Sequence, residues 1–364
     1  MNATGQLHAI GQSLWLDNIT RGMLDDGTLA RYIDTLSVTG LTSNPTIFDH
    51  AIRNGTAYDD AIGRAEGDAS DEAVFVGLAL DDLTRAADLF RPIHDATRGV
   101  DGFVSLEVSP LLADDAQGTI REAARLHARA ARANLFVKIP GTKAGLAAID
   151  ESIFAGVPIN VTLLFSREQY DAAAGAYMRG IERRIAAGRD PRVASVASIF
   201  VSRWDVAVAD KVSPPLRNRL GIAVATDTYR AYRELLASPR WLALSHSGAT
   251  PQRLLFASTG TKDPAASDTL YVEALAAPDT IDTMPDKTLV AFADHGRVQR
   301  VLPTDGGDAA TTIGAFAGAG IDIAALATAL QTEGARAFTA SWRDLLACVA
   351  EKRRALARGV ADGH

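Results

Sequence analysis

The sequence predicts an α/β protein built as a single (β/α)₈ TIM barrel. Short runs of apolar or β-branched residues recur eight times, and the segments between them carry apolar residues at helical spacing. Alternating strands and helices predict a parallel sheet with right-handed crossovers. Because no polar low-complexity linker divides the 364 residues, eight such units favour a closed barrel over an open doubly wound sheet.

The expected strands follow one another along most of the chain. They are residues 13–16, 36–41, 102–108, 135–139, 158–164, 193–200, 253–257 and 288–292. Helices are indicated most clearly over residues 114–133, 166–187 and 226–236. We expect residues 1–364 to form one barrel domain, with helices over residues 320–364 packed on the outer face of the barrel as a structural support.

Composition argues against several classes of protein. A net charge of −7 and a pI near 5.5 disfavour a surface for nucleic acid or for an anionic membrane, although a local basic pocket can still bind a phosphorylated small molecule. No apolar stretch approaches the roughly 18 to 20 residues of a membrane span. The N-terminus lacks the basic and apolar segments of a signal peptide, so we expect a cytoplasmic protein.

Signals for a bound cofactor are missing as well. The seven histidines show no spacing suited to a metal ion, and the glycines of residues 314–320 match neither the dinucleotide-binding nor the Walker pattern. The single cysteine, Cys348, excludes an internal disulfide. We therefore expect neither a metal nor a cofactor.

Lys138 is the most informative residue, because it lies inside the apolar run LFVKIP that is typical of a buried strand. Burying an ammonium group disfavours its charged form, and a neutral amine is the form that attacks a carbonyl to make a Schiff base. An arginine cannot take this role, since its guanidinium stays protonated. Two alternatives remain: Lys138 can be an edge-strand lysine that reaches solvent, or Lys143 can be the nucleophile, although its place after a Pro-Gly turn is typical of a solvated residue that opens a helix.

Polar residues and one aromatic residue also stand at the carboxyl ends of other expected strands, where barrel enzymes place their functional groups. This set comprises Asp17, Asn44, Glu107, Asn160, Thr162, Ser198, Phe200 and Arg203. Because side chains alternate along a strand, Asn160 and Thr162 share one face, as do Ser198 and Phe200. These residues can therefore point into one pocket.

Each of these residues also has a structural interpretation. Asp17 can cap the helix that follows it, and Asn44 before a proline is typical of a turn. Glu107 can form an ion pair with Arg203 or another arginine, and Arg203 can form a surface pair with Asp205. The residues by themselves leave these alternatives open.

Six segments resemble those of transaldolases, in the same order and spread over most of the barrel: LWLDNITR, GLTSNPTIF, VSLEVSP, LFVKIPGT, INVTLLFS and SIFVSRWD. A further stretch, ASTGTKDPAASDTLYVEALAAPDTIDTMPD, is similar to the longer transaldolases of actinobacteria and cyanobacteria. The resemblance covers residues 12–285, and the C-terminal helices fit the same subfamily. It implies a barrel of the class I aldolase type.

The resemblance implies a transaldolase of the non-oxidative pentose phosphate pathway. Such an enzyme moves a dihydroxyacetone unit from sedoheptulose 7-phosphate to glyceraldehyde 3-phosphate, giving erythrose 4-phosphate and fructose 6-phosphate. One alternative is a Schiff-base aldolase that releases free dihydroxyacetone from fructose 6-phosphate, and another is a non-catalytic sugar-phosphate-binding barrel. The expected partners are small sugar phosphates, without nucleic acid or membrane, and the expected state is a monomer or homodimer.

The resemblance also assigns roles to individual residues. Lys138 would form the Schiff base, and Asp17 would take and return the proton of the C4 hydroxyl. Glu107 would act as acid and base through a water that Thr162 also holds. The implied substrate-binding residues are Asn44, Asn160, Ser198, Phe200, Arg203, Ser258 and Lys262.

Lys262 marks a departure from the family pattern. The family has an arginine after the seventh strand that helps to bind phosphate, whereas here Ser258 is followed by Thr-Gly-Thr and then Lys262. We expect Lys262 to replace that arginine. Its ammonium is a point charge where arginine offers a planar fork, so the phosphate contact would differ in strength or position.

Overall fold

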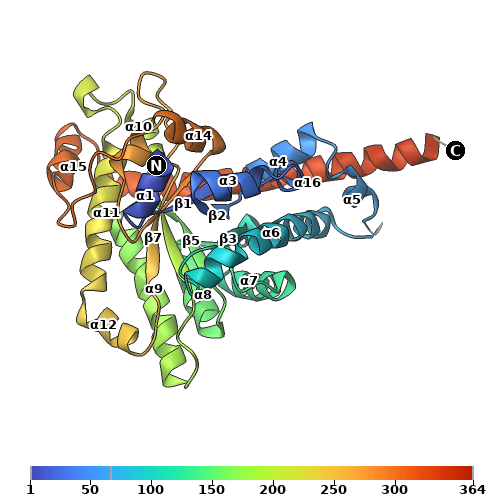
Figure 1. Cartoon of the computed structure of the whole chain (residues 1–364), viewed down its shortest axis with the longest axis horizontal. Helices are drawn as coiled ribbons and strands as arrows, with labels where there is room; N and C mark the ends of the chain where they lie inside the picture. Colours follow the sequence, from blue (N-terminus) through green and yellow to red (C-terminus); the bar gives the residue numbers. More distant parts are fainter. Residues whose placement is uncertain (1, 66–67, 363–364) are drawn as a thin grey trace.

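The computed structural model describes residues 2–65 and 68–362, and its centre is a closed parallel barrel (Figure 1). Each strand pairs with the next, and the last returns to the first. The strands are β1 (Ser13–Asp17), β2 (Val38–Thr42), β3 (Val104–Glu107), β4 (Leu135–Pro140), β5 (Ile159–Leu164), β6 (Ser195–Phe200), β7 (Gln252–Ala257) and β8 (Ile281–Met284). The predicted (β/α)₈ class is confirmed.

Helices follow the strands and surround the barrel. They are α1 (Ala3–Ala9), α2 (Arg21–Asp25), α3 (Thr28–Leu36), α4 (Pro45–Asn54), α5 (Asp59–Gly63), α6 (Asp71–Ala96), the 3₁₀ turn η1 (Pro110–Leu112), α7 (Ala116–Ala130), α8 (Lys143–Ala155), α9 (Arg167–Ala186), α10 (Ser202–Val208), the 3₁₀ turn η2 (Pro214–Leu216), α11 (Leu220–Leu236), α12 (Pro239–His246), α13 (Leu270–Ala274), α14 (Asp286–His295), α15 (Ala309–Gly318) and α16 (Ile323–Asp362). Several begin after a side chain that accepts a hydrogen bond from a backbone N–H three residues on, as Ser166 does for α9.

The predicted eighth strand over residues 288–292 is wrong, because those residues form part of α14. The buried residues of that run are Thr288, Leu289 and Phe292, which is helical spacing. A short apolar run cannot be separated from a buried helical turn by periodicity alone. The real strand is the shorter β8, whose central residues Asp282 and Thr283 are polar and therefore did not match the apolar template.

The barrel interior is filled by apolar rings below and polar side chains above. Trp15, Phe103 and Phe136 are buried inside the barrel, and the rings of Phe103 and Phe136 stack with centroids 4.1 Å apart. The opposite face of each strand packs against the surrounding helices in one large apolar core. The interior is therefore closed over its lower part, and functional side chains can gather only near the carboxyl ends of the strands.

The long helix α16 crosses the carboxyl side of the barrel and does not merely support its outside. It contacts α4, α5, α6 and η1, and it also contacts the end of β5. In Figure 1 it runs beside α4 and α5 out to the C-terminus. Gln331 of this helix donates one hydrogen bond to the carbonyl oxygen of Gly141, which follows β4, and one to that of Leu163, near the end of β5.

Within the described residues, no single helix is long and apolar enough to cross a membrane. Taken together, the helices Ala309–Gly318 and Ile323–Arg358 have the length and composition of a membrane span, but they are bent by 92° at the break between them.

Candidate active site

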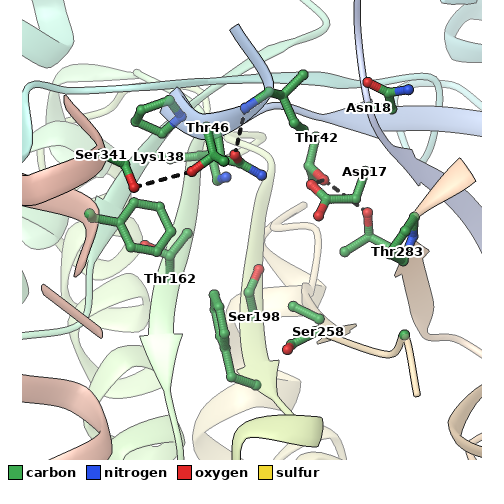
Figure 2. Close-up of a pocket in the computed structure, with 18 of the residues that line it drawn as sticks. Asp17, Asn18, Thr42, Thr46, Lys138, Thr162, Ser198, Ser258, Thr283 and Ser341 are labelled. Atoms are coloured by element: carbon green, nitrogen blue, oxygen red, sulfur yellow. Dashed lines mark hydrogen bonds between the residues drawn. The ribbon is translucent and has the colours of Figure 1, made fainter. Parts of the chain in front are cut away.

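A pocket of about 550 Å³ opens at the carboxyl ends of the strands, beneath α16 (Figure 2). It gathers ten of the residues predicted from sequence: Asp17, Asn44, Lys138, Asn160, Thr162, Ser198, Phe200, Arg203, Ser258 and Lys262. The eleventh, Glu107, lies behind Lys138 and lines a smaller cavity of about 30 Å³ together with Lys138 and Thr162. The structure therefore brings all of the predicted site residues to one place.

The strand register explains why Lys138 and its neighbours meet. Glu107 of β3 pairs with Lys138 of β4, and Lys138 pairs with Asn160 of β5, so three polar side chains stand at one level on one face. The side chains of Lys138 and Glu107 keep only 9% and 11% of their surface exposed. Lys138 is therefore not an edge-strand lysine that reaches solvent.

Two acceptors hold the Lys138 ammonium. Its Nζ donates to the Ser43 carbonyl oxygen at 2.7 Å and to Glu107 Oε1 at 2.9 Å. The rival nucleophile, Lys143, is instead the first residue of α8 and is exposed, outside the pocket lining. The partner of Glu107 is thus a lysine, and the alternative of an arginine ion pair is wrong.

The second oxygen of Glu107 is unpaired in the part of the chain that the structure describes, and the residue lines the smaller cavity. Glu107 Oε2 is buried and has no hydrogen-bond partner among the described residues. Burial raises the pKa of Glu107, the nearby Lys138 charge opposes that effect, and Asp17 adds a weaker upward contribution. A carboxyl group with a raised pKa beside an amine is suited to exchange protons with it.

Asp17 lies across the pocket from this pair, at the end of β1. Thr42, its register partner on β2, donates a hydrogen bond to Asp17 Oδ1 at 2.8 Å, and the hydroxyls of Thr42 and Thr283 lie 2.9 Å apart (Figure 2). The following helix is capped by Thr20, so the capping interpretation of Asp17 is wrong. The Asp17 carboxylate is thus held by Thr42 of β2, which Thr283 of β8 contacts in turn, while Asp17 lines the pocket.

Amide and hydroxyl groups line the floor between these carboxylates. Asn160 donates to Ser105 Oγ at 3.2 Å and accepts from Ser198 Oγ at 2.7 Å, which links β3, β5 and β6. Asn44 is not a turn residue as its structural interpretation expected: its backbone is extended, and its side chain caps α4 by accepting from the N–H of Ile47. Its amide nitrogen has no hydrogen bond within the part of the chain that the structure describes, although the residue lines the pocket.

The far end of the pocket is basic. Arg203 at the start of α10 forms no hydrogen bond or ion pair with any described residue, and burial lowers the pKa of its guanidinium. Ser258 shares a hydrogen bond with Ser202, and Lys262 is exposed at the pocket edge. No carboxylate neutralises Arg203 here, so this end of the pocket suits an anion.

Asp205 does not pair with Arg203, contrary to the surface-pair alternative. Its carboxylate is buried and accepts from the backbone N–H groups of Leu220 and Gly221 and from the hydroxyl of Tyr271. Burial nevertheless raises the pKa of Asp205 to about 6. Asp205 thus fixes the start of α11, a structural role that leaves Arg203 available.

Two groups of residues that line the pocket had no role in the interpretation of the sequence. In the first group, Thr42 donates to Asp17 and Thr283 lies beside it. Alternation along β2 could have identified Thr42. The second group is Ala337, Phe338 and Ser341 of α16. Nothing in the local sequence signals that this helix crosses the site, because the contact depends on long-range packing.

The arrangement can carry out carbonyl chemistry. A buried amine beside a carboxyl group can attack a carbonyl and exchange protons, and a second carboxylate across the pocket can act on a substrate hydroxyl. Among the described residues there is no group of three or more histidine, cysteine, aspartate or glutamate side chains that could hold a metal ion.

Comparisons with known proteins agree with this chemistry. The family described as Transaldolase/Fructose-6-phosphate aldolase matches residues 14–349 of this chain. A transaldolase of Frankia alni is 44% identical over 373 aligned positions, covering 100% of both chains. Transaldolases of an Arthrobacter species and of Neisseria gonorrhoeae are 44% and 40% identical, covering 94% and 95% of this chain and 95% and 99% of their own.

Proposed function

The chain belongs to the transaldolase/fructose-6-phosphate aldolase family and is a transaldolase, and on this premise we propose its reaction and the roles of its residues. The enzyme transfers a dihydroxyacetone unit from sedoheptulose 7-phosphate to glyceraldehyde 3-phosphate, giving erythrose 4-phosphate and fructose 6-phosphate. The observation that carries this proposal is the buried Lys138–Glu107 pair facing Asp17 across one pocket. A binding protein would not need a buried amine between two carboxyl groups.

The first step forms a Schiff base on Lys138. Glu107 accepts a proton from the Lys138 ammonium, and the neutral Nζ attacks the C2 carbonyl of the ketose. The carbinolamine then loses its hydroxyl as water, with a proton supplied by Glu107, and leaves a protonated imine. A water in the small cavity beside Glu107 and Thr162 can relay these protons, since both residues line that space.

The second step breaks the bond between C3 and C4. Asp17 removes the proton of the C4 hydroxyl, the C4 oxygen forms the aldehyde, and the electron pair of the broken bond moves to the iminium to give an enamine on Lys138. Erythrose 4-phosphate leaves, and the three-carbon unit stays covalently bound. The hydrogen bond from Thr42 keeps the Asp17 carboxylate turned toward the pocket while it acts.

The acceptor then reverses these events. C3 of the enamine attacks the aldehyde carbon of glyceraldehyde 3-phosphate, and protonated Asp17 returns its proton to the new C4 oxygen. Water adds to the imine with help from Glu107, and fructose 6-phosphate leaves while Lys138 is restored. The rival aldolase reaction differs at this point: C3 of the enamine takes a proton in place of the aldehyde carbon, and water then hydrolyses the resulting imine to free dihydroxyacetone and Lys138.

The substrate is held at both ends. Asn44 and Asn160 line the pocket with Lys138 and suit the hydroxyl groups of the dihydroxyacetone unit, while Ser198 is assigned to the distal part of the substrate together with Arg203. Arg203, Ser258 and Lys262, next to the Phe200 ring, suit the phosphate at the far end of the pocket. We assign the second positive charge at this end of the pocket to Lys262, whose ammonium group is a point charge.

An acceptor assay tests the reaction. Purified protein is incubated with sedoheptulose 7-phosphate and glyceraldehyde 3-phosphate, and erythrose 4-phosphate and fructose 6-phosphate are measured. Equal amounts of both products, formed only when the acceptor is present, support the transferase. Free dihydroxyacetone released from fructose 6-phosphate at a comparable rate would favour the aldolase, and no turnover of either kind would favour a binding protein.

We further propose that the protein works in the non-oxidative pentose phosphate pathway in the cytoplasm, as a monomer or homodimer that handles small sugar phosphates. Its acidic overall charge and its basic pocket fit such substrates better than nucleic acid or a membrane surface.

A further inference from the structure

The basic residue at the far end of the pocket is held by aromatic rings instead of by an ion pair. Arg203 Cζ lies 5.1 Å from the centroid of the Phe200 ring and 6.0 Å from that of Phe338. Phe200 belongs to the barrel, where its ring also packs on Phe165 at 5.5 Å between centroids. Phe338 belongs to α16, far away in the sequence.

A specific set of contacts fixes α16 in this position. Gln331 donates to the Leu163 carbonyl oxygen at 2.9 Å, at a residue whose backbone adopts a φ of +59°, where β5 departs from regular strand geometry. Further along the helix, Thr46 of α4 donates to Ser341 at 3.1 Å across the mouth of the pocket (Figure 2). The helix is thus attached on both sides of Phe338.

Gly334 allows the close approach between these two attachment points. A Cβ atom placed there would lie 2.9 Å from Leu163 Cδ2 and 3.1 Å from Arg203 Nη1. Glycine is unfavourable inside a helix, by about 1 kcal/mol relative to alanine. Its presence at this buried position therefore has a local reason: the helix backbone must pass directly over Arg203.

We propose that α16 is part of the substrate site, with Phe338 as a positioning residue that orients the Arg203 guanidinium for the substrate phosphate and Gly334 as the residue that makes room for it. This inference rests on the proposed function, in which Arg203 binds phosphate. It adds a specificity element that lies outside the barrel strands.

Contact with two aromatic rings should favour the binding of phosphate by Arg203. A free arginine side chain has many rotamers, and ordering it upon binding would reduce affinity. Contact with two rings restricts the guanidinium beforehand through cation–π attraction and packing, while its N–H groups, unpaired with any described residue, remain available to phosphate oxygens. The rings also exclude water, which strengthens the ionic contact.

The test compares Phe338→Leu with a matched control, Phe316→Leu. Phe316 of α15 is buried in the same apolar cluster as the neighbouring part of α16 but does not line the pocket. We expect Phe338→Leu to raise the KM for fructose 6-phosphate and the inhibition constant of inorganic phosphate by roughly 5- to 30-fold, as loss of a desolvated ring contact implies. Because Phe338 also lines the small cavity beside Glu107, kcat can fall as well, but by a smaller factor than the two phosphate-dependent constants change. Phe338→Tyr, which keeps the ring, should restore both constants.

A phosphate-free measurement separates positioning from general damage. Borohydride trapping of dihydroxyacetone on Lys138 should match the wild type in Phe316→Leu. In Phe338→Leu, whose ring also lines the small cavity beside Glu107, trapping should fall far less than phosphate binding does. Gly334→Ala should act like Phe338→Leu, even though alanine favours the helix. An unchanged KM and phosphate inhibition in both Phe338→Leu and Gly334→Ala, or equal effects in Phe316→Leu, would overturn the proposal.

Arg203→Ala distinguishes this inference from the proposed function. If Arg203→Ala weakens phosphate inhibition and the α16 variants do not, Arg203 binds phosphate without help from α16 and only the further inference fails. If Arg203→Ala leaves phosphate inhibition unchanged, the assignment of the phosphate end of the pocket fails, and the further inference fails with it.

Discussion

Asp282 should make the stability of the fold depend on pH. This carboxyl group is fully buried in β8, accepts one hydrogen bond from Thr259 at 2.8 Å, and leaves its Oδ2 without a partner among the described residues. Desolvation by burial raises the pKa of Asp282 from its ordinary 3.8 to about 7. One pKa unit corresponds to about 1.4 kcal/mol, so ionising Asp282 in the folded state costs up to about 4 kcal/mol.

The sign of the pH dependence follows from proton linkage. Between the two pKa values the folded state binds more protons than the unfolded chain, so the contribution of Asp282 to stability is present at low pH and is lost as pH rises toward about 7. Asp282→Asn removes this loss, because the amide stays neutral. We expect the difference in unfolding free energy between Asp282→Asn and wild type to grow by about 2 to 3 kcal/mol from pH 5 to pH 8, because only about two pH units of the shift lie above pH 5.

Urea unfolding at several pH values measures this difference directly. Comparison with wild type at each pH cancels the contributions of other buried carboxyl groups, such as Asp205. Asp81→Asn on the exposed side of α6 is the matched control and should show no such trend. If the difference in unfolding free energy between Asp282→Asn and wild type stays constant from pH 5 to pH 8, burial does not raise the pKa of Asp282, and this prediction is refuted.

Further predictions concern the catalytic residues. Lys138→Ala should abolish turnover but retain a cooperative unfolding transition; residual activity or a non-cooperative unfolding curve would contradict this. Glu107→Gln should lower kcat/KM by about 10²- to 10⁴-fold, as expected for loss of a general acid and base, measured by the coupled assay under saturating acceptor. Asp17→Asn should slow carbon–carbon cleavage to a similar extent, while a ketose adduct can still be trapped with borohydride. If the adduct is lost as well, Asp17 acts already in Schiff-base formation. Thr42→Val, which removes one hydrogen bond to the Asp17 carboxylate, should reduce kcat by about 10- to 150-fold, and a loss of about 10⁴-fold would show a direct catalytic role.

The polar residues at the strand ends were predictable because barrel geometry turns sequence spacing into position. Lys138, Glu107 and Asn160 share one level once their strands lie in register, and each stands in an apolar run that identifies its strand. Thr283 was missed for the opposite reason. Its strand is only four residues long and half polar, so a neighbouring apolar helical segment matched the strand pattern better.

The contribution of α16 could not be predicted from the sequence. Its local pattern indicates an amphipathic helix, which is equally compatible with packing on the outside of the barrel. What brings Phe338 over the pocket is a set of long-range contacts, including Gln331 with the Leu163 carbonyl and Ser341 with Thr46. Such contacts depend on the unusual backbone at the end of β5, which no local sequence pattern indicates.

Trapping of the covalent intermediate tests the central claim most directly. The protein is treated with fructose 6-phosphate and sodium borohydride, which reduces a Schiff base to a stable amine, and the modified peptide is identified by mass mapping. We expect a single adduct on Lys138, which depends on ketose and is absent from Lys138→Ala. An adduct on Lys143, or no adduct under conditions that support turnover, would contradict the account.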